Sequence, residues 1–320
     1  MKMTMTLEPK RSIQWQMARQ IGVEGAVFHF LSSYKKDSSF LTYKNLKFLQ
    51  EELAKEDLHF SISEGDPLPL TKTKLGLAGR DKEIAIYCDF IRILGDLGIP
   101  TVCYNFMAGL NWARTETSKK IRGGALSSGF RYEDMEQTEI DTQGVRLTTT
   151  LVWNNLYYFL DKVLPVAEQA GVNLSLHPDD PPIENFYNLK RIISSPDAYR
   201  RIFRDFPSDR NTMTFCQSNI KLMDVDIYDL AEEFGKQRKI SFVHFRDIEG
   251  DKYNFHETFH DDGPTDMNKM MKIYQKFSNN AFIRPDHVPT LVGEDNTNYG
   301  YNMLGRLYAI GYMKGLMDNT

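Results

Sequence analysis

The chain has 320 residues, of which 41% are hydrophobic and 26% are charged, a composition typical of a folded globular protein and not of a disordered one. Its 39 basic and 43 acidic residues are interleaved and give a net charge of −4, so the sequence has no basic arm of the kind that binds nucleic acid. No apolar stretch is long enough to span a bilayer, and segment 1–11 lacks the apolar core of a signal peptide, which predicts a cytoplasmic protein.

Short apolar runs recur along the chain, and each is followed by a stretch in which apolar residues have helical spacing. The runs predict strands covered on both faces, at 2–7, 25–30, 58–63, 100–105, 172–177, 212–216, 240–245 and 281–284. The clearest predicted helices cover 84–94 before Gly98, 152–170 before Gly171, and 267–277. Their methionine and aromatic stripes are interpreted as packing surface.

The alternation of strands and helices predicts a parallel sheet with right-handed crossovers. Eight repeats without a hairpin signal are the number that closes an α/β fold of the (β/α)₈, or TIM, barrel type. A doubly wound open sheet is the alternative, but it would need a glycine-rich turn after the first strand, and Leu7-Glu8-Pro9-Lys10 is not one. We expect one catalytic domain over 1–320, with an insertion at about 107–150, after the fourth strand, that is interpreted as a lid or an oligomer contact.

Four consecutive predicted strands end in, or run into, possible metal ligands. These are His177, Cys216, His244 and Asp286. The carboxyl ends of barrel strands meet at one rim, and a mixed nitrogen, sulfur and oxygen set suits a borderline transition ion better than calcium or magnesium. A lone histidine or cysteine is more often packed or hydrogen-bonded than a ligand, but the coincidence on four successive strands favours a catalytic metal site.

Other polar residues at or near strand ends are candidates for binding a substrate. They are Asn105, Asp179, Arg246, His260 and Arg284. The two arginines could bind a carboxylate bidentately or could instead pair with Asp247 or Asp286 in the barrel wall. Asp179 could orient His177 or contact the substrate, and Asn105 and His260 could contact hydroxyl groups. Three further residues are interpreted as structural or as ordinary loop groups: His29, His59 and Glu64.

Several motifs together resemble the mannonate dehydratase family over nearly the whole chain. They are His-Pro-Asp-Asp-Pro-Pro at 177–182, Phe-Cys at 215–216, His-Phe-Arg-Asp at 244–247, Glu-Thr-Phe-His at 257–260 with Asp-Met at 266–267, and Arg-Pro-Asp-His at 284–287 followed by Gly-Tyr at 300–301. The resemblance implies a xylose-isomerase-like barrel and a hydro-lyase of hexuronate catabolism that converts D-mannonate to 2-keto-3-deoxy-D-gluconate. It also implies Mn²⁺ or Fe²⁺, a small-molecule sugar acid as partner, and a homo-oligomer, a dimer or larger.

The resemblance also assigns roles to individual residues. The family's metal ligands fall on His177, Cys216, His244 and Asp286, and its acid–base pair falls on His287 and Tyr301. The reaction removes a proton from C2 and expels the C3 hydroxyl, so it needs both a base and an acid, and the choice between the pair stays open. Two other activities also stay open, namely a sugar or sugar-acid isomerase or epimerase and a dehydratase of a related aldonic acid, as does a binding protein without turnover.

Overall fold

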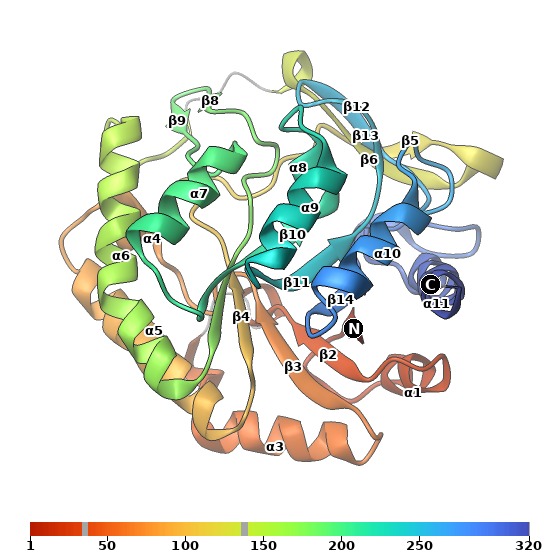
Figure 1. The fold of residues 1–320 in the computed structure, drawn as a ribbon, viewed down its shortest axis with the longest axis horizontal. Coiled ribbons are helices and arrows are strands. Elements are labelled where there is room, and N and C mark those ends of the chain that lie inside the picture. Colours follow the sequence, from red (N-terminus) through yellow and green to blue (C-terminus); the bar gives the residue numbers. More distant parts are fainter. Residues whose placement is uncertain (34–37, 136–139, 320) are drawn as a thin grey trace.

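The computed structural model describes residues 1–33, 38–135 and 140–319, and in this part of the chain eight parallel strands close a barrel (Figure 1). The strands are β1 (Lys2–Thr6), β2 (Gly25–Phe28), β3 (His59–Glu64), β4 (Thr101–Tyr104), β7 (Asn173–Leu176), β10 (Asn211–Cys216), β11 (Ile240–Phe245) and β14 (Phe282–Pro285). Their order around the barrel is β1-β14-β11-β10-β7-β4-β3-β2. The predicted barrel is therefore confirmed, with each strand at its predicted place.

Helices surround the strands on the outside of the barrel (Figure 1). The longer ones are α1 (Ile13–Gln20), α3 (Tyr43–Ala54), α5 (Arg80–Asp96), α6 (Thr149–Ala170), α7 (Pro196–Asp205), α9 (Ile227–Lys236), α10 (Met267–Phe277) and α11 (Met303–Asp318). Three short helices, α2 (Phe30–Ser33), α4 (Thr71–Leu75) and α8 (Gln217–Lys221), follow β2, β3 and β10. The predicted strand 25–30 is two residues too long because Phe30 already begins α2.

Helix α6 shows how local sequence sets the position of the rim. The hydroxyl of Thr148 accepts a hydrogen bond from the amide of Leu151 and caps the start of the helix. Gly171, with φ of 71°, ends it in the left-handed conformation that favours glycine. β7 then begins at Asn173, so that His177 follows the carboxyl end of this strand. The apolar face between these caps is buried against the barrel: Val152, Leu156, Phe159, Leu160, Val163 and Ala167.

An antiparallel sheet beside the barrel corrects the expectation that the chain has no hairpin. Its order is β12-β13-β6-β5, made of β12 (Ile248–Asp251), β13 (Asn254–Glu257), β6 (Leu126–Arg131) and β5 (Glu116–Lys120). β5 and β6 come from the predicted insertion, and β12 and β13 come from the loop after β11. The sequence of β5, Glu-Thr-Ser-Lys-Lys, has no apolar alternation, so its strand conformation depends on the neighbours with which it pairs.

Phe130 on β6 and Phe255 on β13 join the two halves of this sheet, with ring centroids 5.7 Å apart. The predicted insertion thus packs against the loop after β11. Positions 136–139 of the insertion lie outside the described residues. A two-stranded pair, β8 (Asn185–Phe186) with β9 (Leu189–Lys190), lies between β7 and α7. No helix in the described ranges is both long enough and apolar enough to cross a membrane.

Candidate metal centre and active-site cavity

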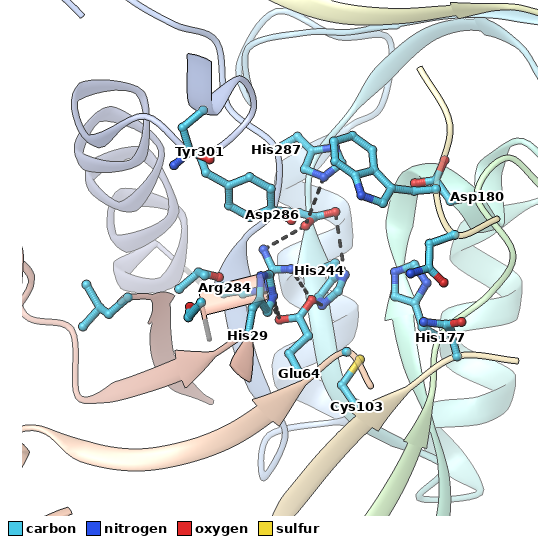
Figure 2. A pocket seen from close by; sticks show the side chains of 18 of the residues that line it. His29, Glu64, Cys103, His177, Asp180, His244, Arg284, Asp286, His287 and Tyr301 are labelled. Carbon is cyan, nitrogen blue, oxygen red and sulfur yellow. Dashed lines mark hydrogen bonds and ion pairs between the residues drawn. The ribbon is translucent and has the colours of Figure 1, made fainter. Parts of the chain in front are cut away.

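A cavity of about 480 Å³ opens at the carboxyl ends of the barrel strands (Figure 2). Its lining includes residues at or directly after the ends of seven strands: Thr6, His29, Glu64, Asn105, His177, His244 and Asp286. His287 and Tyr301 line it as well. This is the end of the barrel at which the sequence predicts the site.

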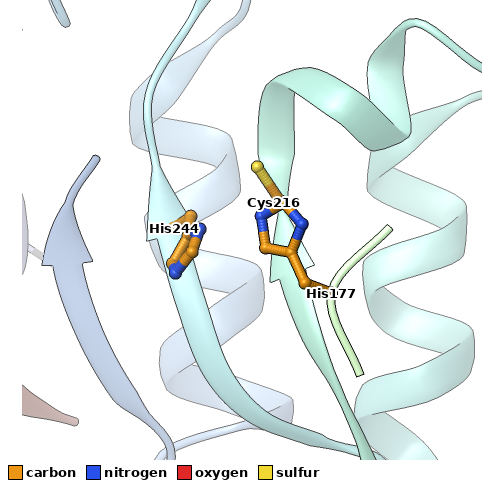
Figure 3. A group of neighbouring side chains, drawn as sticks. All are labelled: His177, Cys216 and His244. Carbon is orange, nitrogen blue, oxygen red and sulfur yellow. The ribbon is translucent and has the colours of Figure 1, made fainter. Parts of the chain in front are cut away.

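The four predicted metal ligands lie together. One ligand atom from each of His177, Cys216 and His244 lies within 4.8 Å of the other two (Figure 3). Asp286 Oδ2 lies 3.7 Å from Cys216 Sγ and 3.6 Å from His244 Nδ1. Because β7, β10, β11 and β14 are adjacent in the barrel, their ends bring these side chains to one place.

The ligand set fits a divalent transition ion. His244 is 1% exposed; its Nε2 faces Glu64 Oε1 at 3.1 Å, whereas its Nδ1 has no hydrogen-bond partner within the described residues. Buried polar atoms normally have partners, so a nitrogen of this kind is suited to a metal. His177 Nδ1 donates to the carbonyl of Pro178 at 2.7 Å, which leaves Nε2 with the lone pair that a ligand needs. Burial lowers the pKa of His177 and thereby favours the neutral, ligating form.

Arg246 and Arg284 both form ion pairs with carboxylates of the protein. Arg284 donates to Glu64 through Nε at 2.9 Å and Nη2 at 2.5 Å, and its Nη1 lies 2.8 Å from Asp286 Oδ1. Arg246 pairs with Asp286, Nε to Oδ2 2.6 Å, and also with Asp180 and Glu257. Burial raises the pKa of Asp286, but the nearby cations, Arg284 foremost, outweigh this and lower it.

The sequence left open whether these arginines bind a substrate carboxylate or pair with Asp247 or Asp286. Pairing with Asp286 in the barrel wall is what both side chains do, whereas Asp247 takes neither and instead accepts from Lys221 at 2.9 Å. Each guanidinium is only 1% exposed, and Arg246 does not line the cavity. Their charges are therefore already compensated by the protein.

His287 and Tyr301 both line the cavity, and their rings pack edge to face with centroids 5.3 Å apart. His287 Nδ1 donates to Glu257 Oε1 at 2.9 Å. Burial raises the pKa of Glu257, but Arg246, His287 and Arg114 overcome this effect and lower it to about 2, so Glu257 is an acceptor only. Burial raises the pKa of Tyr301, which keeps its phenol protonated at neutral pH.

The other three residues predicted to bind a substrate differ in whether they reach the cavity. Asn105 lines the cavity, where its Oδ1 accepts from Lys74 Nζ at 2.9 Å. Asp179 and His260 are buried away from the cavity lining. Asp179 accepts from the amide of Ile193 at 2.8 Å, and His260 Nε2 donates to the carbonyl of Phe245 at 2.7 Å. The structure therefore does not bring these two side chains to the cavity.

The insertion supplies residues that sequence reasoning missed. The side chain of Arg114 is fully buried and donates to Asp180 at 2.7 Å and to Glu257 at 2.6 Å. The ring of Trp112 lies 5.0 Å from that of His287 and 5.6 Å from that of Tyr299. Nothing in the polar sequence around them distinguishes these two residues from ordinary loop residues.

His29 and Glu64 also belong to the cavity, which corrects their interpretation as a structural residue and a loop carboxylate. Glu64 is 7% exposed, and its Oε1 lies 3.1 Å from His244 Nε2 (Figure 2). His29 Nε2 lies 3.3 Å from Glu64 Oε2. A signal for both was present, because they stand at the carboxyl ends of β2 and β3. His59, by contrast, begins β3 at the opposite end and is exposed.

Comparisons with known proteins identify the family of this chain. The family model described as D-mannonate dehydratase matches residues 1–153 and 143–320. The mannonate dehydratase of Thermotoga maritima is 30% identical over 350 residues, which cover 98% of this chain and 94% of that protein. The crystal structure of mannonate dehydratase from Streptococcus suis serotype 2 superposes with a TM-score of 0.91 at 27% identity and covers 100% of this chain and 94% of that chain.

The barrel has more distant relatives of known structure. A xylose isomerase domain protein from Planctomyces limnophilus superposes with a TM-score of 0.63 at 10% identity, covering 99% of this chain and 96% of that chain. At this identity the likeness concerns the fold alone. It confirms the expected xylose-isomerase-like form of the barrel.

Proposed function

This chain belongs to the mannonate dehydratase family, and from that premise we propose that it dehydrates D-mannonate to 2-keto-3-deoxy-D-gluconate. The observation that carries the proposal is that His177, Cys216, His244 and Asp286 lie together beside one cavity. The same cavity is lined by His287 and Tyr301, a possible base and a possible acid.

The four clustered side chains would hold a divalent ion, Mn²⁺ or Fe²⁺. When bound, such an ion supplies Lewis acidity that stabilises negative charge developing on substrate oxygens. Glu64 orients the ring of His244. Its Oε1 faces His244 Nε2, and His244 Nδ1 therefore faces Asp286. The choice of ion, the homo-oligomeric state and the cytoplasmic location stay predictions.

The hydrogen bonds around His287 favour it as the base. Glu257 accepts a hydrogen bond from Nδ1–H, so the neutral ring carries its lone pair on Nε2 and can take the proton from C2. Tyr301, which is protonated at neutral pH, can donate its phenolic proton to the C3 hydroxyl, which leaves as water. The resulting enol ketonises to the 2-keto-3-deoxy acid, so one water is lost for each substrate.

Gly300 permits the close approach of these two residues. Its φ of 81° is in the left-handed region, and a Cβ there would lie 3.3 Å from the ring of His287. The chain can thus turn directly beside His287 and present Tyr301 to the cavity two residues before α11 begins.

The direct test is an assay of the metal-loaded protein with D-mannonate that measures the 2-keto-3-deoxy product and metal content together. We expect product formation that a chelator abolishes and added Mn²⁺ or Fe²⁺ restores. Cys216→Ala should lose both bound metal and activity, whereas Cys88→Ala, a buried cysteine on α5, should keep both. A metal-loaded protein that leaves D-mannonate unchanged, or that interconverts ketoses without loss of water, would overturn the proposal.

A further inference from the structure

Arg306 is a buried arginine of the cavity that the proposed chemistry does not use. It stands in the first turn of α11, is 4% exposed and lines the cavity on the β1 side together with Thr6 and Gln14. Nη1 donates to the carbonyl of Thr6, Nη2 to Gln14 Oε1 at 3.4 Å and Nε to the carbonyl of Asn302 at 3.4 Å. All three acceptors are neutral.

No carboxylate among the described residues lies within ion-pairing distance of Arg306. Burial lowers the pKa of Arg306 to about 10, because the more distant carboxylates of Glu294 and Glu8 oppose the effect of burial only weakly, yet the group is still a cation at neutral pH. Burying an unpaired charge is costly, so a site that does so is suited to an anionic ligand. A guanidinium has five N–H donors, of which the protein here uses three, leaving two for such a ligand.

The other buried arginines of the site are different. Arg114, Arg246 and Arg284 are paired with four carboxylates: Glu64, Asp180, Glu257 and Asp286. With the Cys216 thiolate that metal binding requires, these groups carry two negative charges in excess, which a divalent ion would neutralise. Arg306 then leaves the buried site with one positive charge, the complement of a single carboxylate.

We propose that Arg306, with Gln14 beside it, binds the carboxylate of the sugar-acid substrate and thereby selects an acid sugar over the corresponding neutral sugar. The inference rests on the proposed function and replaces Arg246 and Arg284 in the role expected for them from the sequence. Tyr301 and Arg306 line the same cavity, on either side of the start of α11. A carboxylate held by Arg306 therefore brings the adjacent C2 and C3 towards the acid–base pair.

The test compares an acid with its neutral analogue in metal-loaded protein. Arg306→Met removes the charge, and we expect the KM for D-mannonate to rise at least about tenfold, since hydrogen bonds to charged groups contribute more than neutral ones. The inhibition constant of D-mannitol and the metal content should stay within about twofold of the wild type, because neither depends on a carboxylate. Arg204→Met, at an exposed position on α7, is the matched control and should change neither constant.

Arg306 also ties the end of β1 to α11, so a second variant guards against loss of folding. Arg306→Lys keeps the charge but not the planar fork, and we expect its KM for D-mannonate to lie between those of the wild type and the methionine variant. If either variant changes the D-mannitol and D-mannonate constants by the same factor, or leaves both unchanged, the proposal is wrong.

Failure of the proposed function would be recognised separately. If the wild type does not turn over D-mannonate, calorimetry of D-gluconate against D-glucitol still measures selection for a carboxylate. A preference for the acid that disappears in Arg306→Met supports the carboxylate site whatever reaction follows, and the absence of any preference in the wild type overturns it.

Discussion

The two ends of the barrel each have a cavity of similar size, and only the one at the carboxyl end is the candidate active site. The amino-end cavity, at the starts of β7, β10, β11 and β14, measures about 570 Å³, against about 480 Å³ at the carboxyl end. Its basic residues Lys236, Arg238 and Lys276 are exposed, whereas Arg246, Arg284 and Asp286 at the carboxyl end are at most 3% exposed. The volume of a cavity therefore does not identify the active site. Buried, paired charges do identify it, because burying an ion costs several kcal/mol unless other groups compensate it.

A neutral layer separates the two ends inside the barrel. Ser175, Thr212, Thr214 and Ser241 form a chain of hydroxyl hydrogen bonds of 2.7–2.9 Å. Thr214 Oγ1 also donates to Cys103 Sγ at 3.1 Å, and burial raises the pKa of Cys103, so this thiol stays protonated. The buried charges are thus confined to the carboxyl-end rim, and substitutions at the two ends should have different effects.

The largest expected effect at the carboxyl end is on catalysis. His287→Asn removes the proposed base, and we expect kcat for D-mannonate to fall by about 10²- to 10⁴-fold. Metal content should be unchanged, because His287 is not in the ligand group. Steady-state kinetics beside metal analysis of the same preparation measures both, and full activity in this variant would remove His287 from the mechanism.

A smaller effect is expected on stability when one buried ion pair is broken. Arg114→Met removes a partner of Asp180 and Glu257, and we expect the free energy of unfolding to fall by about 3 kcal/mol. Urea denaturation measures this change. Arg122→Met, in the same insertion, is the matched control, because its pair with Asp261 is part-exposed and should contribute less than about 1 kcal/mol. Equal losses in the two variants would mean that burial does not distinguish the two pairs.

The smallest effect is expected at the amino end. Lys276→Ala removes an exposed charge from the amino-end cavity, and we expect the free energy of unfolding to change by less than about 0.5 kcal/mol, with kcat and KM unchanged. The same denaturation and kinetic measurements apply. A clear loss of activity would contradict the distinction between the two ends, because it would show that the amino-end cavity takes part in function.

Local sequence patterns predict the order of strands and helices and the group of four clustered side chains. Apolar periodicity and end signals such as Gly171 depend on neighbouring residues, and they gave strands within two residues of the observed ones. Once the strands alternate with helices, a closed parallel barrel places His177 and Cys216 on adjacent ends. The antiparallel sheet had no such local signal, because β5 is polar along its length.

The contacts of each rim side chain depend on long-range packing. Arg114 meets Glu257 across 143 positions of sequence, and Arg284 meets Glu64 across 220. The same long-range packing turns His260 away from the cavity and, within the part of the chain that the structure describes, leaves Arg306 without a carboxylate at ion-pairing distance. The end of a strand places the backbone of a residue at the rim. The direction of its side chain and the compensation of its charge depend on partners from distant parts of the chain, and these partners cannot be identified from neighbouring residues.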